Sequence, residues 1–198
     1  KLELLDSHAF ENLSSSAGFK LGNYDFDLDY TDDVIVMGSS GLLVYDGDDL
    51  SSPVLNLSEF PLQSGVVREF FVTDMDWDGD GDILVNNGSG VYLVHGDGMS
   101  FGSPEQVFAG TNVASFGAFE IDGDFYKDVL VLNGSGQKWQ YNFFQGGASF
   151  STLESEIINS PNYRCNKILI FDQNKDNIQS LVCFDSDDNQ IRIYHREN

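Results

Sequence analysis

The stretch DMDWDGDGDILV, residues 74–85, decides how this sequence is interpreted. Asp stands at every second position from Asp74 to Asp82, and the apolar run Ile83–Val85 follows directly. Asp and Gly favour tight turns over helices because their side chains and backbones suit turn geometry. A short branched apolar run favours a buried strand. The stretch therefore predicts an acidic loop that leads straight into a strand.

Three further segments repeat this pattern. They are DFDLDYTDDVIV at 25–36, EIDGDFYKDVLV at 120–131 and DQNKDNIQSLVC at 172–183. The four segments begin about 50 residues apart, a period that is typical of propellers and other repeat folds. Each is followed by a Gly/Ser or polar turn and further strand-length runs, so each repeat is expected to form a four-stranded antiparallel blade.

We therefore expect an all-β fold and a single domain, a four-bladed β-propeller spanning residues 1–198. The blades are expected at about 17–57, 66–109, 113–157 and 166–195. The fourth repeat is expected to have three strands, and residues 2–5 are expected to form a spare strand before the first repeat. Pairing this strand with the fourth blade would close the ring and remove an exposed sheet edge.

The charge of the chain excludes several classes of partner. Asp and Glu number 32 against 10 Lys and Arg, so the formal net charge is −22. Nucleic acids and anionic bilayers need clustered cations, so neither is an expected partner. No apolar run is long enough to insert into a membrane. We expect a monomeric domain.

Alternating carboxylates in a tight loop suit calcium, which takes six to eight oxygen ligands. Positions 1, 3, 5 and 9 supply side chains, and position 7 supplies a backbone carbonyl. An EF-hand would need Glu at position 12, but Val36 and Val85 stand there. The EF-hand is therefore excluded, because the loop ends at position 9 and continues as a strand.

A D-x-D-x-D-G-x-x-D loop between two strands, repeated about every 50 residues, resembles the FG-GAP or VCBS repeat. Integrin alpha-subunit propellers, many bacterial secreted proteins and some fungal lectins carry this repeat. The resemblance implies that each loop joins the first two strands of a blade and binds calcium on one face of the propeller. It also implies a ligand on the opposite face or in a cleft between blades.

Carried over position by position, the resemblance implies four unequal calcium loops. Their ligands would be Asp25, Asp27, Asp29, Thr31 and Asp33; Asp74, Asp76, Asp78, Asp80 and Asp82; Glu120, Asp122, Asp124, Tyr126 and Asp128; and Asp172, Asn174, Asp176 and Ile178. The fourth loop has Ser180 at position 9, so three calcium ions are expected and the fourth site is doubtful. The alternative for each loop is an Asp-rich turn that caps its own amides without an ion.

Loops of this kind in extracellular modules bind calcium at about 10⁻⁴–10⁻³ M, which predicts an extracellular, cell-surface or periplasmic setting. Cys165 and Cys183 are the two cysteines, and either a disulfide or two buried thiols is compatible with the sequence. The expected strand pairing places Cys183 opposite Leu169. The three histidines are scattered at positions 8, 95 and 195, so no zinc site is expected.

Aromatic residues are the candidates for ligand contact. Trp139 and Tyr141 alternate along one strand, so they line either a blade interface or the wall of a ligand cleft. Trp77 either packs over the adjacent loop or stacks on a sugar. The expected function is a calcium-binding recognition module for a glycan or an extracellular protein. The alternative is an enzyme, a lyase or hydrolase, or an accessory domain of an extracellular polysaccharide-degrading enzyme.

Overall fold

The computed structural model describes residues 19–38, 41–57, 67–120, 124–135, 138–147, 151–159, 165–171, 180–185 and 189–195. Within these ranges the regular elements are all β-strands. The prediction of an all-β fold is confirmed. In the same ranges no helix is long and apolar enough to cross a membrane.

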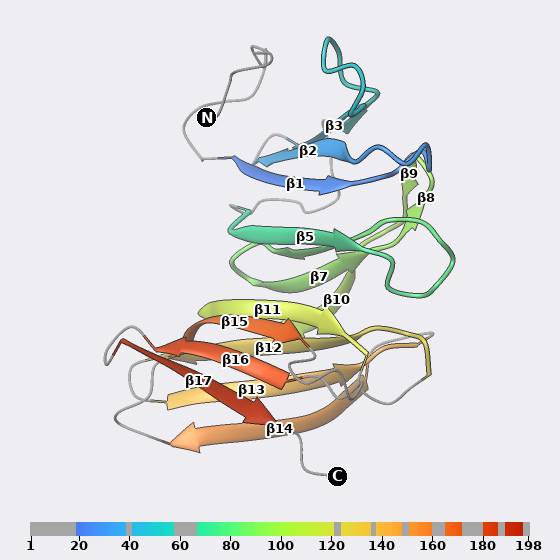
Figure 1. Cartoon of the computed structure of the whole chain (residues 1–198). Coiled ribbons are helices and arrows are strands. Elements are labelled where there is room, and N and C mark those ends of the chain that lie inside the picture. Colours follow the sequence, from blue (N-terminus) through green and yellow to red (C-terminus); the bar gives the residue numbers. More distant parts are fainter. Residues whose placement is uncertain are drawn as a thin grey trace.

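The strands form four antiparallel sheets, each built from strands that follow one another along the chain (Figure 1). The first three sheets have four strands and the fourth has three, while β8 and β9 pair as a separate hairpin. The first sheet comprises β1 (Lys20–Tyr24), β2 (Asp33–Gly38), β3 (Gly41–Tyr45) and β4 (Leu55–Leu57). The second comprises β5 (Glu69–Thr73), β6 (Asp82–Asn86), β7 (Gly90–Val94) and β10 (Glu105–Ala109), with β8 (Gly96–Asp97) and β9 (Ser100–Phe101) inserted before β10. The third comprises β11 (Val113–Phe119), β12 (Asp128–Ser135), β13 (Lys138–Gln145) and β14 (Ser151–Asn159), and the fourth β15 (Cys165–Phe171), β16 (Ser180–Asp185) and β17 (Gln190–His195).

Each acidic segment connects the first strand of a sheet to the second. The residue before position 1 pairs with the residue at position 9 in every sheet, as in Thr73↔Asp82 of the second sheet and Phe171↔Ser180 of the fourth. The loops therefore span the same number of residues and close at the same ladder position. In Figure 1 the strands β1, β5 and β11 run in the same direction, so the loops that follow them emerge at one end of the stack.

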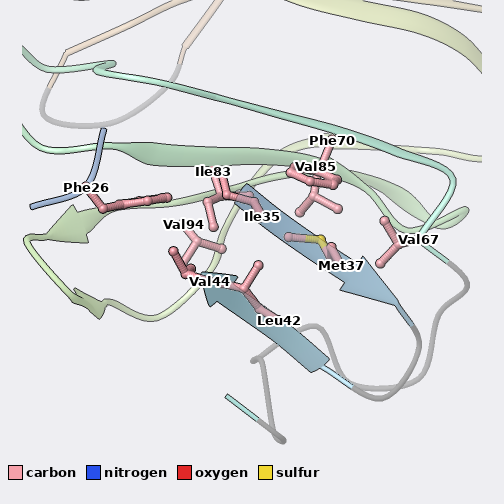
Figure 2. Packing of buried hydrophobic residues seen from close by; sticks show 10 residues of the cluster. All are labelled: Phe26, Ile35, Met37, Leu42, Val44, Val67, Phe70, Ile83, Val85 and Val94. Carbon is pink, nitrogen blue, oxygen red and sulfur yellow. The ribbon is translucent and has the colours of Figure 1, made fainter. Parts of the chain in front are cut away.

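The sheets pack face to face in the order of the sequence. Figure 2 shows the first core cluster, where β2 and β3 pack against β5, β6 and β7. In β6, Ile83 and Val85 face this cluster, whereas Leu84 faces a second cluster with the third sheet. In the same way, Leu130 and its neighbours on β12 divide between the second cluster and a third, which includes Ile168. The second strand of an inner sheet is buried on both faces, which explains its continuous apolar run.

The row of sheets is not closed into a ring by the described residues. In Figure 1 the first and fourth sheets lie toward opposite ends of the row. The fourth sheet also leaves one apolar face exposed. Its exposed side chains are Leu169, Phe171, Phe184, Ile191 and Ile193. The expected four-bladed propeller is thus not confirmed, and the expected closing strand at 2–5 lies outside the described residues.

The fourth sheet contains a cysteine that forms a disulfide bond. Cys183 is buried and disulfide-bonded, and Cys165 is the other cysteine of the chain. In the β15–β16 ladder Cys183 pairs with Ile168 rather than with Leu169. The expected register was wrong by one residue, because Phe171, the residue before position 1 of the loop, pairs with Ser180 at position 9, and the ladder runs without a break from this pair to Ile168 and Cys183.

Candidate metal centre

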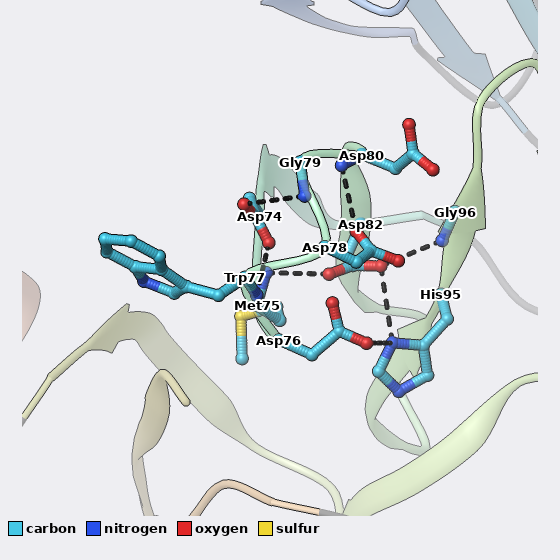
Figure 3. A network of polar contacts seen from close by, with 10 residues as sticks. All are labelled: Asp74, Met75, Asp76, Trp77, Asp78, Gly79, Asp80, Asp82, His95 and Gly96. Atoms are coloured by element: carbon cyan, nitrogen blue, oxygen red, sulfur yellow. Dashed lines mark hydrogen bonds and ion pairs between the residues drawn. The ribbon is translucent and has the colours of Figure 1, made fainter. Parts of the chain in front are cut away.

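The second loop, residues 74–82, is described completely and brings three carboxylates together. One oxygen from each of Asp74, Asp76 and Asp78 lies within 4.8 Å of the other two. Backbone amides hold the loop in this shape (Figure 3): Asp74 accepts from Trp77 N at 2.7 Å and from Gly79 N at 3.2 Å. Asp78 accepts from Asp80 N at 2.9 Å. Short-range capping therefore turns the acidic side chains toward one region.

Position 9 of this loop has a structural role in addition to its expected one as a ligand. Asp82 is 0% exposed, and both of its carboxylate oxygens accept backbone hydrogen bonds. Met75 N donates to Oδ2 at 2.7 Å, and Gly96 N donates to Oδ1 at 2.8 Å. Asp82 thus ties the start of its own loop to the chain that follows β7.

The first and third sheets repeat this connection. Asp33 accepts from Phe26 N at 2.9 Å and from Gly47 N at 3.1 Å. Asp128 accepts from Gly146 N at 3.0 Å. We call Gly47, Gly96 and Gly146 the latch glycines. A Cβ on any of them would lie closer than 3.0 Å to a backbone carbonyl oxygen at position 8 of the loop, so the close approach requires Gly.

The latch glycines were not identified from the sequence. A signal was present, because Gly stands at the end of the third strand in each of these three repeats, as Asp46-Gly47, His95-Gly96 and Gln145-Gly146. It was missed because the contact joins residues 14 to 18 positions apart. Such a spacing is not visible within a nine-residue motif.

The first loop also brings its carboxylates together, with one oxygen from each of Asp25, Asp27 and Asp29 within 4.8 Å of the others. Asp25 accepts from Asp29 N at 3.0 Å and from Tyr30 N at 2.9 Å, and Asp29 accepts from Thr31 N at 2.7 Å. The first and second loops therefore have the same organisation.

The other two loops are described in part. In the third loop, Asp124 accepts from Tyr126 N at 2.9 Å, as the equivalent Asp29 and Asp78 do for their loops. Asp122 lies outside the described residues, and so do Asp172, Asn174, Asp176 and Ile178 of the fourth loop. The predictions for those residues remain predictions.

The electrostatics of the loops favour a cation. Burial raises the pKa of the Asp76 carboxyl, and the neighbouring Asp82 and Asp78 carboxylates raise it further, while His95 lowers it. Burial also raises the pKa of Asp33, although the amides of Phe26 and Gly47 oppose the shift. Clustered carboxylates thus destabilise one another's charged forms, and a bound cation would relieve this repulsion.

His95 lies beside these carboxylates, although the spacing of the three histidines predicted no zinc site. Its Nδ1 is 3.3 Å from Asp82 Oδ1 and 3.5 Å from Asp76 Oδ2. The contact with the Asp82 side chain raises the pKa of the imidazole, although burial opposes it. Sequence inspection did not find this residue because it follows Asp82 by 13 positions, across two strands.

Aromatic side chains project from the same loops. Trp77 and Phe125 are exposed, and their ring centroids are 5.4 Å apart in a T-shaped contact between the second and third loops. Trp77 thus contacts the adjacent loop through Phe125 while most of its ring stays exposed. The two loops also meet through Lys127, whose N–H donates to the Met75 carbonyl at 2.8 Å.

Several of these projecting residues adopt left-handed backbone conformations. Tyr30 and Phe125 both have φ of 75° at position 6, where the second loop has Gly79, and Trp77 has φ of 66° at position 4. Tyr30 is 98% exposed. Positive φ is unfavourable for large side chains, so the loop geometry imposes strain at these positions.

The other aromatic candidates are located only by their backbone. Trp139 and Tyr141 lie on β13, paired with Gly134 and Leu132 of β12. Their place at a blade interface or in the wall of a ligand cleft stays a prediction.

The chain matches no protein-family profile and no curated protein.

Proposed function

We propose that this chain is a calcium-binding recognition module in which calcium is structural. The observation that carries the proposal is the second loop, where three carboxylates converge and Asp76 Oδ1 is buried without a hydrogen-bond partner among the described residues. An unpartnered buried carboxylate oxygen is costly. A cation among Asp74, Asp76 and Asp78 would supply the missing partner.

The donor set of this loop fits calcium. Asp74, Asp76 and Asp78 offer carboxylate oxygens, and the Asp80 carbonyl is the expected backbone ligand. Asp82 retains a free lone pair on each carboxylate oxygen while it accepts its two amides. Calcium prefers such all-oxygen sets and accepts irregular geometry, so it is the ion that these side chains suit best.

Calorimetry and thermal melting test the calcium proposal. Millimolar calcium should bind with about three ions per chain, and chelation should lower the melting temperature because a ligand of the folded state stabilises it. Asp78→Asn should remove one ion from the stoichiometry. Asp80→Ala is the matched control, since it removes a carboxylate of the same loop but keeps the backbone carbonyl. No heat of binding, or identical melting with and without chelator, would contradict the proposal.

We place the module outside the cytosol. Loops of this kind bind at about 10⁻⁴–10⁻³ M, a concentration that extracellular calcium reaches. The disulfide-bonded Cys183 supports the same setting, because disulfides persist in oxidising compartments.

A neutral glycan is the ligand that the exposed side chains favour. Three bound calcium ions would leave a formal charge of about −16, which disfavours anionic polysaccharides. Trp77 and Phe125 present exposed rings beside the acidic loops, and aromatic rings stack on sugars. A glycan array with calcium, comparing wild type with Trp77→Ala and Phe125→Ala, tests this ligand class. Binding only to sulfated glycans, or only to an extracellular protein, would contradict it.

We also propose that the four sheets belong to a propeller. The exposed apolar face of the fourth sheet, which includes Leu169, Ile191 and Ile193, supports this architecture. A contiguous apolar face is unusual on a soluble surface and would be buried by a neighbouring blade. Residues 2–5 are the strand expected to complete the fourth blade.

A further inference from the structure

His95 forms a second group of potential ligand atoms together with two carboxylates of the second loop. Asp76 Oδ2 and Asp82 Oδ1 of the second loop meet Nδ1 of His95, which follows β7, at distances of 3.5 Å and 3.3 Å. The three residues each offer an atom within 4.8 Å of the others. Figure 3 shows the imidazole edge and both carboxylates directed toward one another.

These contacts leave polar atoms without hydrogen bonds. His95 Nδ1 is shielded from solvent and has no hydrogen-bond partner among the described residues; Asp76 Oδ1 is also unpartnered, but the Asp76 oxygen nearest the ring is Oδ2. The charged contacts of His95 therefore have ion-pair distances without hydrogen-bond geometry. A cation between the ring and the carboxylates would satisfy the nitrogen and partner the acids at the same time.

The spacing suits a small divalent ion. Zinc binds His nitrogen and carboxylate oxygen at about 2.0–2.2 Å, so two tetrahedral ligand atoms lie about 3.4 Å apart. The observed separations of 3.3 Å and 3.5 Å agree with this value. An imidazole ligand also distinguishes the group from the calcium loop, because calcium takes oxygen ligands and borderline transition metals accept imidazole.

We propose that His95, Asp76 and Asp82 form a site for a borderline divalent transition-metal ion such as Zn²⁺, adjacent to the calcium loop. The ligands are held in place before the metal arrives. Gly96 N donates to Asp82 at 2.8 Å, and Gly102 N donates to the His95 carbonyl at 2.8 Å, so the backbone on both sides of the ring is anchored. Asp76 and Asp82 are shared with the proposed calcium site, and the zinc site does not require calcium to be bound there.

Of the three sheets in which the structure describes a latch glycine, only the second has a histidine at this place. The residue before the latch glycine is Asp46 in the first sheet, His95 in the second and Gln145 in the third. Asp46 offers only oxygen and Gln145 only a neutral amide. The imidazole ligand is therefore the feature that separates the second sheet from its neighbours.

Calorimetry with Zn²⁺ and, separately, Ca²⁺ tests the site near neutral pH on the chain without a histidine tag. His95→Gln introduces the side chain of the third sheet and should weaken zinc binding by about tenfold or more, with calcium binding unchanged. Asp78→Asn should weaken calcium binding and leave zinc binding unchanged, because Asp78 is outside the zinc group. His8→Gln and His195→Gln are the matched controls and should leave zinc binding as in wild type.

A variant designed to gain a zinc site tests the proposal independently if His95→Gln folds poorly. Asp46→His places an imidazole before the first latch glycine, and it should add a second zinc ion per chain. Zinc binding that is equal in wild type and a folded His95→Gln variant would overturn this proposal while the calcium site stands. Calcium binding that is unchanged in Asp78→Asn would instead refute the calcium proposal and leave the zinc site intact.

Discussion

Replacing Asp82 with Ala should be among the most destabilising single changes in the second sheet. The substitution removes the acceptor of two hydrogen bonds, from Met75 N at 2.7 Å and Gly96 N at 2.8 Å. Both donor residues are buried, so water cannot replace the carboxylate. A buried donor that loses its partner costs about 1–3 kcal/mol, so the two together should lower the free energy of unfolding by about 2–6 kcal/mol.

Asp82→Asn separates the loss of a hydrogen-bond acceptor from the formation of a cavity, both of which occur in Asp82→Ala. Asn has nearly the same shape, and its carbonyl oxygen can accept one of the two amides. Its NH₂ group then faces the other amide as a second donor. The expected cost is about 1–3 kcal/mol, between wild type and Asp82→Ala.

Urea unfolding followed by tryptophan fluorescence measures these differences. All samples should contain chelator, because a bound metal would add its own stabilisation of the folded state. Asp80→Ala is the control, since it removes a carboxylate from the same loop without removing an acceptor of the latch, and it should change stability by no more than about 0.5 kcal/mol. If Asp82→Ala is as stable as Asp80→Ala in chelator, the two hydrogen bonds to the Asp82 carboxylate do not stabilise the fold, and the reasoning is refuted.

Three further predictions concern the latch glycine, the strained loop and the ring. Gly96→Ala places a Cβ closer than 3.0 Å to the Gly81 carbonyl oxygen and should lower the free energy of unfolding in urea by about 1–3 kcal/mol. Gly102→Ala is the control and should cost less, because its Cβ would lie 3.6 Å from the nearest atom. Equal losses of stability in the two variants would contradict the steric argument. Tyr30→Gly should leave stability unchanged or raise it by up to about 1 kcal/mol, because Gly adopts positive φ without strain and the 98% exposed ring loses no buried contact; a clear loss of stability would show that the ring packs against a partner. Deleting residues 1–6 should lower the melting temperature and promote association by exposing an edge, and a monomeric product with unchanged melting, measured by calorimetry and light scattering, would exclude closure by this strand.

The acidic loops could be predicted from the sequence because their structure is local. Asp74 and Asp78 cap amides two to five residues away, and such short-range hydrogen bonds are what Asp and Gly encode in a turn. The apolar runs after the loops predicted strands for the same reason. The loops therefore lie where the repeat placed them, between the first and second strands of each sheet.

The strained residues show the limit of that local reasoning. Position 6 of the second loop is Gly79, which suits positive φ, and the equivalent Tyr30 and Phe125 adopt the same region at a cost. Propensity alone disfavours this conformation for aromatic residues. In the first loop, the hydrogen bond from Tyr30 N to the carboxylate at position 1 and the closing ladder pair outweigh the preference of this one residue.

What the sequence by itself determined is the unit: an acidic loop, the strand after it, and an antiparallel sheet repeated along the chain. The tertiary structure decided what lies beside each loop. Gly96 and His95 reach Asp82 only because β6 and β7 pair and return the chain to the same end of the sheet. That proximity depends on strand register and on the packing of sheets over both faces of β6, and neither is encoded in the nine residues of the loop.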